Sequence, residues 1–260
     1  MSVIGVVSMK GGVGKTTVTA NLATALSSKL GAGRVCVLDL DPQNALHWHF
    51  DPADQSTNGI CQGAPNGRAQ DAQSPWHAAA QKNSSGVFVL PYGEANEAQR
   101  HTFERVLSDQ PDWIGQHIRD AGLDENAVVL IDTPPGASVY LQQVFACADL
   151  VLIILLADAG SYATVPAMET WLAEKAADYP HVTTRYVLNQ VDRSQAINRD
   201  IADALCGHLG ERVYGIGIHQ DDAVSEALAF QQSVLVREPH SQPSHDFDRL
   251  AISVIGTLNQ

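Results

Sequence analysis

The sequence predicts an α/β fold in which a doubly wound, mostly parallel sheet of seven to eight strands has helices on both faces. Three observations support this prediction. Apolar runs of strand length alternate with helix-like stretches along most of the chain. Most of the runs are continuously apolar, as expected for strands that are covered on both faces. The first run is followed by a glycine-rich turn that leads directly into a helical pattern.

Seven apolar runs define the expected strands. They span Val3–Ser8, Arg34–Asp39, Gly86–Pro91, Ala127–Asp132, Asp149–Leu155, Thr184–Asn189 and Val213–Ile218. Helical patterns lie at Gly14–Leu30, His101–Ala121, Gly136–Ala148, Val165–Asp178, Gln195–His208, Asp221–Gln231 and Phe247–Leu258. A repeated strand–helix order implies right-handed crossovers, so we expect ligands beyond the carboxyl ends of the strands.

Residues 51–85 interrupt this order because they are rich in Gln, Asn, Ala, Gly, Ser and Pro and hold few large aliphatic side chains. We expect a long surface insertion within one domain that spans residues 1–260. Its large apolar anchors are Ile60 and Trp76, and a short helix is expected at Trp76–Gln81. Loops of this length are usually functional or disordered, so a partner contact and a mobile insertion both remain open.

Composition excludes several classes of protein. The chain has 16 basic and 29 acidic residues, a net charge of −13, and no run of Lys or Arg, which disfavours binding to a phosphate backbone. Its longest apolar run, Leu150–Ala157, is too short to span a membrane, and the N-terminus has no signal-peptide pattern. We expect reduced structural thiols in a cytosol, because no CxxC pair occurs among Cys36, Cys61, Cys147 and Cys206.

A glycine-rich segment, Ser8–Thr17, connects the first strand to the first helix. Glycines let the backbone curl so that successive N–H groups point at one anion. Lys15 is expected to reach the β- and γ-phosphates of a nucleotide, and the Thr16 hydroxyl to bind Mg²⁺. The ordinary pattern GxxxxGK[ST] is not met, because its first Gly would fall at Met9. The predicted phosphate-binding residues are Lys10, Gly11, Gly12, Val13, Gly14, Lys15, Thr16 and Thr17.

Carboxylates stand at the ends of two further apolar strands. The segment Val35–Gln43 carries Asp39 and Asp41, and the segment Val128–Gly136 carries Asp132. A strand-end Asp is often only a helix cap or a turn residue. Phosphoryl transfer, however, requires charge neutralisation and a group that orients the attacking water, and these carboxylates follow a phosphate loop in that order.

Together these motifs resemble the deviant Walker A branch of the P-loop ATPases, the MinD/ParA family, which includes nitrogenase iron protein and arsenite-pump ATPases. The resemblance implies that Lys10 reaches across a dimer interface to the nucleotide of the other subunit, in a homodimer that sandwiches ATP. It also implies that Asp41 positions the attacking water, that Asp39 lies near Mg²⁺ and that Asp132 holds Mg²⁺ through water. The expected reaction is slow, Mg²⁺-dependent ATP hydrolysis with Lys10, Lys15 and Asp41 as catalytic residues.

Nucleotide identity depends on the end of the sixth expected strand. Asn189 resembles the family position at which an Asn hydrogen-bonds the adenine, although a strand-end Asn is also a common turn former. The stretch Asn189–Asp192 differs from the G-protein pattern NKxD by a Gln in place of Lys. These residues leave GTP open, and the deviant loop favours ATP.

The C-terminal third of the chain indicates a smaller group within this family. Ile218–Val234 is similar to the family segment after the last strand, with His219 in place of the usual Pro. Together with Leu90–Gly93, Gly136–Ser138 and Ala157–Ala159, this stretch resembles the BcsQ group, the MinD-like ATPases of bacterial cellulose-secretion operons. Some members of that group have lost their loop lysines and switch carboxylates, whereas this chain keeps them, so the resemblance implies that it can hydrolyse ATP.

The resulting prediction is an ATP-dependent dimerisation switch that localises or activates the cellulose synthase secretion complex. We expect a cytoplasmic protein, recruited to the inner membrane by a complex component or a small accessory protein, without membrane insertion of its own. The alternative is a ParA-type partitioning ATPase, which needs basic patches for DNA and is disfavoured by the net charge of −13. A MinD-like membrane oscillator needs a basic amphipathic C-terminal helix, but Asp248–Gln260 has one Arg and no Lys.

Overall fold

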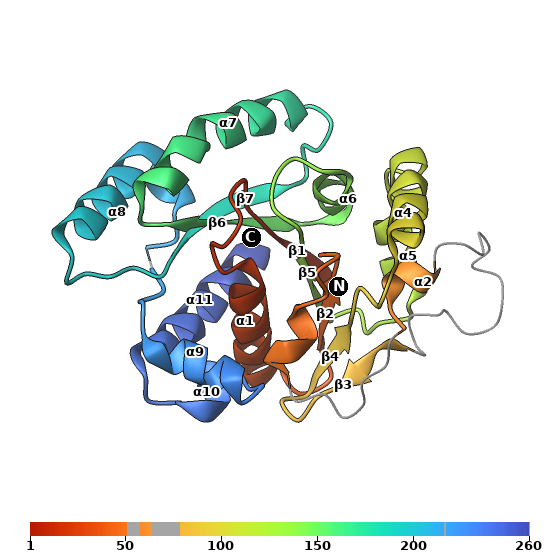
Figure 1. Cartoon of the computed structure of the whole chain (residues 1–260), viewed down its shortest axis with the longest axis horizontal. Helices are drawn as coiled ribbons and strands as arrows, with labels where there is room; N and C mark the ends of the chain where they lie inside the picture. Colours follow the sequence, from red (N-terminus) through yellow and green to blue (C-terminus); the bar gives the residue numbers. More distant parts are fainter. Residues whose placement is uncertain (51–57, 64–78, 216, 260) are drawn as a thin grey trace.

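The computed structural model describes residues 1–50, 58–63, 79–215 and 217–259, and it contains one seven-stranded sheet of order β3-β4-β2-β5-β1-β6-β7 (Figure 1). All neighbouring strands pair in parallel except β3, which runs antiparallel to β4. The strands are β1 Ser2–Val7, β2 Val35–Asp39, β3 Gln81–Lys82, β4 Val87–Leu90, β5 Val128–Asp132, β6 Leu150–Leu156 and β7 Thr183–Asn189. The predicted fold class is therefore confirmed.

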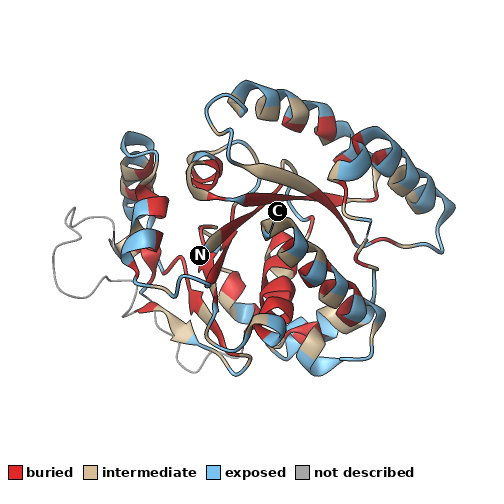
Figure 2. Cartoon of the chain, turned by 180° about the vertical axis from the view of Figure 1, so that it is seen from behind, coloured by how far each residue is buried: buried red, intermediate tan, exposed pale blue. Residues whose placement is uncertain are grey.

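Helices cover both faces of this sheet. One buried apolar cluster joins one sheet face to α1, η1, α9, α10 and α11, and a second joins the other face to α2 and α4–α8. Figure 2 shows burial concentrated in the sheet and the helix faces turned toward it. The bounds are α1 Lys15–Leu30, η1 Leu46–His49, α2 Ile60–Gly63, α4 Glu97–Asp109, α5 Trp113–Asp120, α6 Val139–Cys147, α7 Ala159–Lys175, α8 Ala196–Leu209, η2 Gly210–Arg212, α9 Asp222–Ala229, α10 Val234–Arg237 and α11 Gln242–Leu258.

Three helix predictions differ from the structure, one of them at α11, which begins at Gln242, five residues before the predicted Phe247. The helix expected at His101–Ala121 is two helices, α4 and α5, because Pro111 disfavours helical backbone at Gln110, which caps α4 with φ −129° and ψ 87°. Helix α7 begins six residues before the predicted Val165, at Ala159, with Pro166 inside it. The Asp158 carboxylate caps this helix by accepting a hydrogen bond from the Ser161 N–H at 2.6 Å.

The strand expected at Val213–Ile218 is the clearest error. In the described residues, Val213 and His219 make only isolated parallel bridges, to Tyr186 and Val191. Two glycines in this stretch explain the difference, because Gly weakens a strand. At Gly217 an added Cβ would lie 2.9 Å from the Val191 side chain, so a larger residue would push the two segments apart.

The insertion predicted at 51–85 is described at residues 58–63 and 79–85. Ile60 is fully buried, as its predicted anchoring role requires, and its N–H donates to the Pro91 carbonyl at 3.0 Å. Trp76 and the first half of the helix expected at Trp76–Gln81 lie outside the described residues, and Gln81 belongs to β3. No helix in the described ranges is long and apolar enough to cross a membrane.

Candidate phosphate-binding site

The site begins with the loop between β1 and α1, at the carboxyl edge of the sheet. Gly12 and Gly14 have φ of 74° and 83°, in the left-handed region where glycine is favoured. Gly14 is the N-cap of α1 and gives the helix no side-chain cap. The first N–H groups of a 16-residue helix are thus left to an anion, which the positive end of the helix dipole also attracts.

Lys15, the first residue of α1, is buried, with 7% of its surface exposed. Burial lowers the pKa of its ammonium group, while the Asp132 and Asp41 carboxylates act in the opposite direction. An ammonium group in this position is stabilised by further negative charge. A nucleotide phosphate at the N-terminus of α1 would provide that charge.

Two carboxylates lie beneath the loop and are fully buried. Asp39 and Asp132 are opposite each other in the pairing of β2 with β5. The Thr16 hydroxyl donates to Asp132 at 2.6 Å, and the N–H groups of Asp41 and Leu46 donate to Asp39 at 2.9 and 3.1 Å. Burial is the main cause that raises the pKa of Asp132 to about 6, and burial together with the charge of Asp132 raises the pKa of Asp39.

This donor set fits Mg²⁺. A hydroxyl and two carboxylates are the hard oxygen ligands that Mg²⁺ prefers, and the phosphates of a nucleotide complete such sites. The raised pKa values of Asp39 and Asp132 have the same implication, because burial and neighbouring carboxylates disfavour the charged form of each group. A divalent cation would relieve the repulsion between these carboxylates.

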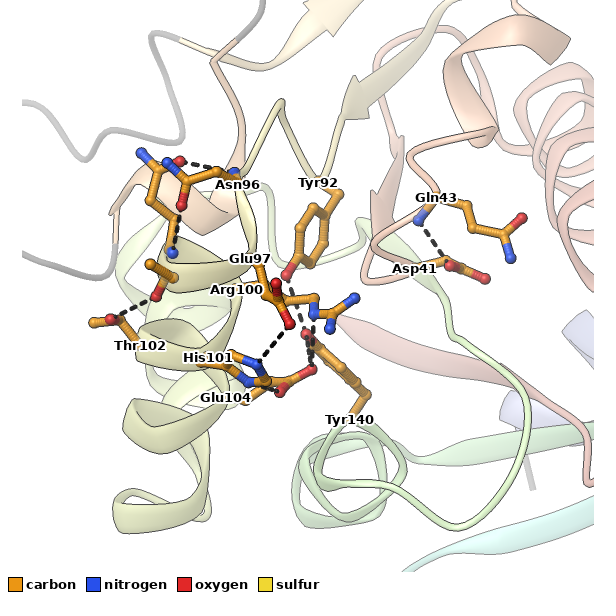
Figure 3. Close-up of polar contacts among 12 residues, drawn as sticks. Asp41, Gln43, Tyr92, Asn96, Glu97, Arg100, His101, Thr102, Glu104 and Tyr140 are labelled. Atoms are coloured by element: carbon orange, nitrogen blue, oxygen red, sulfur yellow. Dashed lines mark hydrogen bonds and ion pairs between the residues drawn. The ribbon is translucent and has the colours of Figure 1, made fainter.

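Asp41 lies outside the sheet, in a turn that begins where β2 ends. Its carboxylate accepts a hydrogen bond from the Gln43 N–H at 2.9 Å, and its carbonyl accepts one from the Asn44 N–H at 2.8 Å. Beside this turn is a polar cavity of about 370 Å³, into which Arg100 extends from α4 (Figure 3). The cavity is lined by Pro42, Tyr92, Ala95, Asn96, Glu97 and Arg100. Asp41 is therefore held by local turn contacts, is partly buried, and lies within electrostatic range of Lys15 and Asp132.

Lys10, at the head of the loop, has a different environment from Lys15. Its ammonium forms an ion pair with Asp158 at 2.7 Å, and both side chains are about one-third exposed, at 34% and 39%. Asp158 caps α7 with its other carboxylate oxygen. In the single chain, Lys10 therefore points toward the start of α7 and is held by its own subunit.

Asn189 supports the loop from the end of β7. Its side chain is buried, and its amide donates to the Val13 carbonyl at 2.8 Å. At Gly14 an added Cβ would lie 2.5 Å from the same amide nitrogen, so the contact also requires a glycine there. The family resemblance predicts that Asn189 hydrogen-bonds the adenine. The contact present in the chain is to the phosphate loop, and the adenine contact stays a prediction.

The predicted site residues are brought together at this edge of the sheet. The sequence prediction missed Asp158, which joins them through Lys10, and it also missed Asp246, the partner of His219. Asp158 follows β6 with a Ser three residues later, a capping pattern that a search for strand-end carboxylates would have found. Asp246 is buried within α11 and accepts from the His219 ring and backbone N–H at 2.8 and 3.0 Å. No local pattern marks Asp246, because its partner is 27 residues away.

Comparison with known proteins identifies relatives over nearly the whole chain. The family model described as "Cellulose biosynthesis protein BcsQ" matches residues 1–255. Cellulose biosynthesis protein BcsQ of Escherichia coli K12 is 29% identical over 238 residues, covering 90% of this chain and 86% of that protein. Chromosome-partitioning ATPase Soj of Thermus thermophilus is 27% identical over 279 residues, covering 99% and 96%.

A solved structure of low sequence identity shares the fold. The septum site-determining protein MinD of Pyrococcus horikoshii, complexed with Mg-ADP, superposes with a TM-score of 0.71 at 20% identity. The match covers 97% of this chain and 95% of that one. The doubly wound sheet is thus that of the MinD/ParA proteins.

Proposed function

The chain belongs to the family of cellulose biosynthesis protein BcsQ, and on that premise we propose that it is an ATP-dependent dimerisation switch for the cellulose synthase secretion complex. It is a P-loop ATPase of the ParA/MinD type. The observation that best supports the switch is that the two lysines of the phosphate loop have different environments. Lys15 is buried where a phosphate would bind, whereas Lys10 is only partly buried and is held by Asp158.

In the proposed reaction, the loop N–H groups and Lys15 bind the β- and γ-phosphates of ATP. Thr16, Asp39 and Asp132 would hold Mg²⁺, which supplies positive charge against the phosphates. Asp41 orients the attacking water, and its electrostatic coupling to Lys15 supports a position beside the phosphates. The relative's complex with Mg-ADP supports ATP and Mg²⁺ as substrate and cofactor.

In the proposed switch, Lys10 exchanges one negatively charged partner, Asp158, for another, a nucleotide phosphate. In the free chain Lys10 pairs with Asp158. In the ATP-bound dimer it leaves Asp158 and contacts the phosphates of the partner subunit's nucleotide, and hydrolysis returns it. We propose that residues 1–260 act as one domain in the cytoplasm, and that a component or small accessory protein of the cellulose synthase complex recruits the dimer to the inner membrane.

Light scattering coupled to size-exclusion chromatography tests the switch. The purified protein should be a dimer with Mg²⁺-ATP and a monomer with Mg²⁺-ADP, and it should release phosphate slowly. A monomer in both nucleotides would overturn the dimer switch. The cellulose role is tested in cells that lack the gene. Cellulose output should be restored by the wild-type gene but not by Lys15→Ala expressed at the same level, and normal output without the gene would overturn that role.

The similarity to Soj favours one alternative, a partitioning ATPase that binds DNA. Several C-terminal arginines are already engaged within the chain, which argues against a DNA-binding surface. Arg212 pairs with Glu169 at 2.7 Å, and the Arg237 guanidinium lies 3.9 Å from the Phe230 ring centroid. Fluorescence anisotropy with random duplex DNA and Mg²⁺-ATP at physiological salt should show no binding. Salt-sensitive, ATP-dependent binding at micromolar protein would favour partitioning instead.

A further inference from the structure

Exposed apolar side chains gather at one place on the surface. In the described residues, eight large hydrophobic side chains are exposed, and four of them belong to η1, α9 and α10 or their ends. Helix η1 packs against α9, and α9 packs against α10. His49 and Val236 also line one small cleft, which connects the end of η1 to α10. We call the set the η1–α9–α10 patch, and it consists of Trp48, Leu228, Phe230 and Val236.

The exposure of this patch is high for residues of this size. Phe230 is 58% exposed, Val236 49% and Trp48 47%. Helices α9 and α10 lie side by side at one end of α1, on the outside of the molecule (Figure 1). Single exposed apolar residues are normal on a protein surface, but a group of aromatic and aliphatic side chains on adjoining elements is typical of an interaction site.

The rim of the patch is acidic, and this charge selects among occupants. Asp222 and Glu226 on α9 and Glu238 after α10 are all exposed. The nearby cation, Arg237, is stacked on Phe230. An acidic rim repels anionic lipid headgroups, and it also repels the same face of a second copy of a chain with net charge −13. It attracts an apolar surface that is flanked by Lys or Arg.

The patch is also connected to the candidate site. The first residue of η1, Leu46, donates its N–H to the buried carboxylate of Asp39 at 3.1 Å. The N–H of Asp41 donates to the same carboxylate at 2.9 Å. A change in the Asp39–Asp41 segment on nucleotide binding would therefore shift η1, and with it Trp48.

We propose that the η1–α9–α10 patch is the docking surface for a basic amphipathic helix of a protein partner, with an affinity that depends on the bound nucleotide. The apolar face of such a helix would cover Trp48, Phe230 and Val236. Its Lys and Arg side chains would pair with Asp222, Glu226 and Glu238. The nucleotide dependence rests on the proposed function, whereas the docking surface itself does not.

A matched pair of variants tests the surface. The probe is a fluorescently labelled Leu/Lys peptide of about 18 residues with leucines on one face, long enough to be helical. Phe230→Asp and Val236→Asp should each weaken its binding about tenfold. Ile197→Asp adds the same charge at a residue of α8 that is 61% exposed and should leave binding unchanged. A peptide with Glu in place of Lys should bind at least about tenfold more weakly than the Leu/Lys peptide.

Four outcomes would overturn the proposal. The first is equal binding of the two peptides, and the second is unchanged peptide binding in Phe230→Asp and Val236→Asp. The third is an equal loss of peptide binding in Ile197→Asp. The fourth is Phe230-dependent binding to phosphatidylglycerol vesicles with no binding of the peptide. Equal peptide affinity with Mg²⁺-ATP and Mg²⁺-ADP would overturn the nucleotide dependence. Phe230→Asp should retain the melting temperature and the phosphate release of wild type. If the wild-type protein does not dimerise with ATP, that result contradicts the proposed function but leaves the docking surface untouched.

Discussion

The floor and the rim of the phosphate-binding site are built in different ways. The floor consists of Lys15, Asp39 and Asp132, which are buried and positioned by paired strands or by the start of α1. The rim consists of Lys10 and Asp41, which lie on turns at the surface. The comparison indicates that the groups that bind every nucleotide are fixed in the core, whereas the groups proposed to act during the cycle lie on turns and are only partly buried.

The floor has an electrostatic cost that the rim does not have. Because the pKa of Asp132 is raised from 3.8 to about 6, the folded chain binds its proton more tightly than the unfolded chain does. The corresponding stabilisation is complete below pH 3.8 and is lost as the pH rises through about 6. At neutral pH the nucleotide-free floor is therefore a local cost in stability, as is common at functional sites.

The largest expected effect concerns the rim group nearest to the chemistry. Asp41→Ala should lower the rate of ATP hydrolysis by roughly 10²–10⁴-fold, on the order of 3–5 kcal/mol of barrier, because it removes the group that orients water. ATP binding should persist, because the floor is intact, and the dimer should be trapped. Phosphate release and light scattering on one sample measure both effects. Normal turnover would exclude Asp41 as the catalytic carboxylate.

A floor substitution should act on binding instead. Lys15→Ala should weaken ATP binding by about 100-fold, on the order of 3 kcal/mol, because it removes a desolvated cation from the phosphate site. Calorimetric titration with a non-hydrolysable ATP analogue measures the loss. Lys29→Ala, at the far end of α1, removes a surface lysine and should have no effect. Near-wild-type affinity in Lys15→Ala would mean that the buried lysine does not contact phosphate.

The electrostatic cost of the floor can be measured directly. Asp132→Asn should stabilise the nucleotide-free chain at pH 7 by on the order of 1–3 kcal/mol, since it removes a buried charge. This gain should shrink as the pH falls through about 6. In the wild type, Mg²⁺ affinity should decrease over the same range, because the carboxylate must lose its proton to bind the ion. Thermal unfolding from pH 5 to 8 measures stability, and a lower melting temperature for Asp132→Asn at pH 7 would contradict this account.

The smallest effect is expected at the contact that holds Lys10. Asp158→Asn removes the charge but keeps a side chain that can cap α7. Because such ion pairs contribute at most about 1 kcal/mol each and the dimer breaks one in each subunit, ATP-dependent dimerisation should tighten by no more than about fivefold per subunit, or about 25-fold per dimer. Asp248→Asn, which breaks the 2.9 Å Lys29–Asp248 pair away from the loop, is the control. Weaker dimerisation in Asp158→Asn, measured by analytical ultracentrifugation, would mean that Asp158 acts in the dimer itself.

The sequence predicted the floor better than the rim. Strands β1, β2 and β5 are continuous apolar runs, so the positions of Lys15, Asp39 and Asp132 followed from strand order alone. The contact of Lys10 with Asp158 joins residues 148 positions apart and depends on where α7 begins, which sequence reasoning placed six residues late. Residues 213–218 after β7 have the apolar pattern of a strand, and this pattern alone does not show that their two glycines prevent a regular strand.

The central claim is that Lys10 serves the partner subunit while Asp41 serves its own. Mixing Lys10→Ala with Asp41→Ala tests it, since each variant alone should be nearly inactive. In a mixed dimer, the Lys10→Ala subunit keeps its own Asp41 and receives Lys10 from the other subunit, so one site is complete. If the two variants are mixed as monomers before ATP is added, about half of the dimers should be mixed, and the mixture should recover up to about a quarter of the wild-type rate. No recovery, with mixed dimers detected by cross-linking of differently tagged subunits, would place Lys10 at the nucleotide of its own subunit and contradict the account.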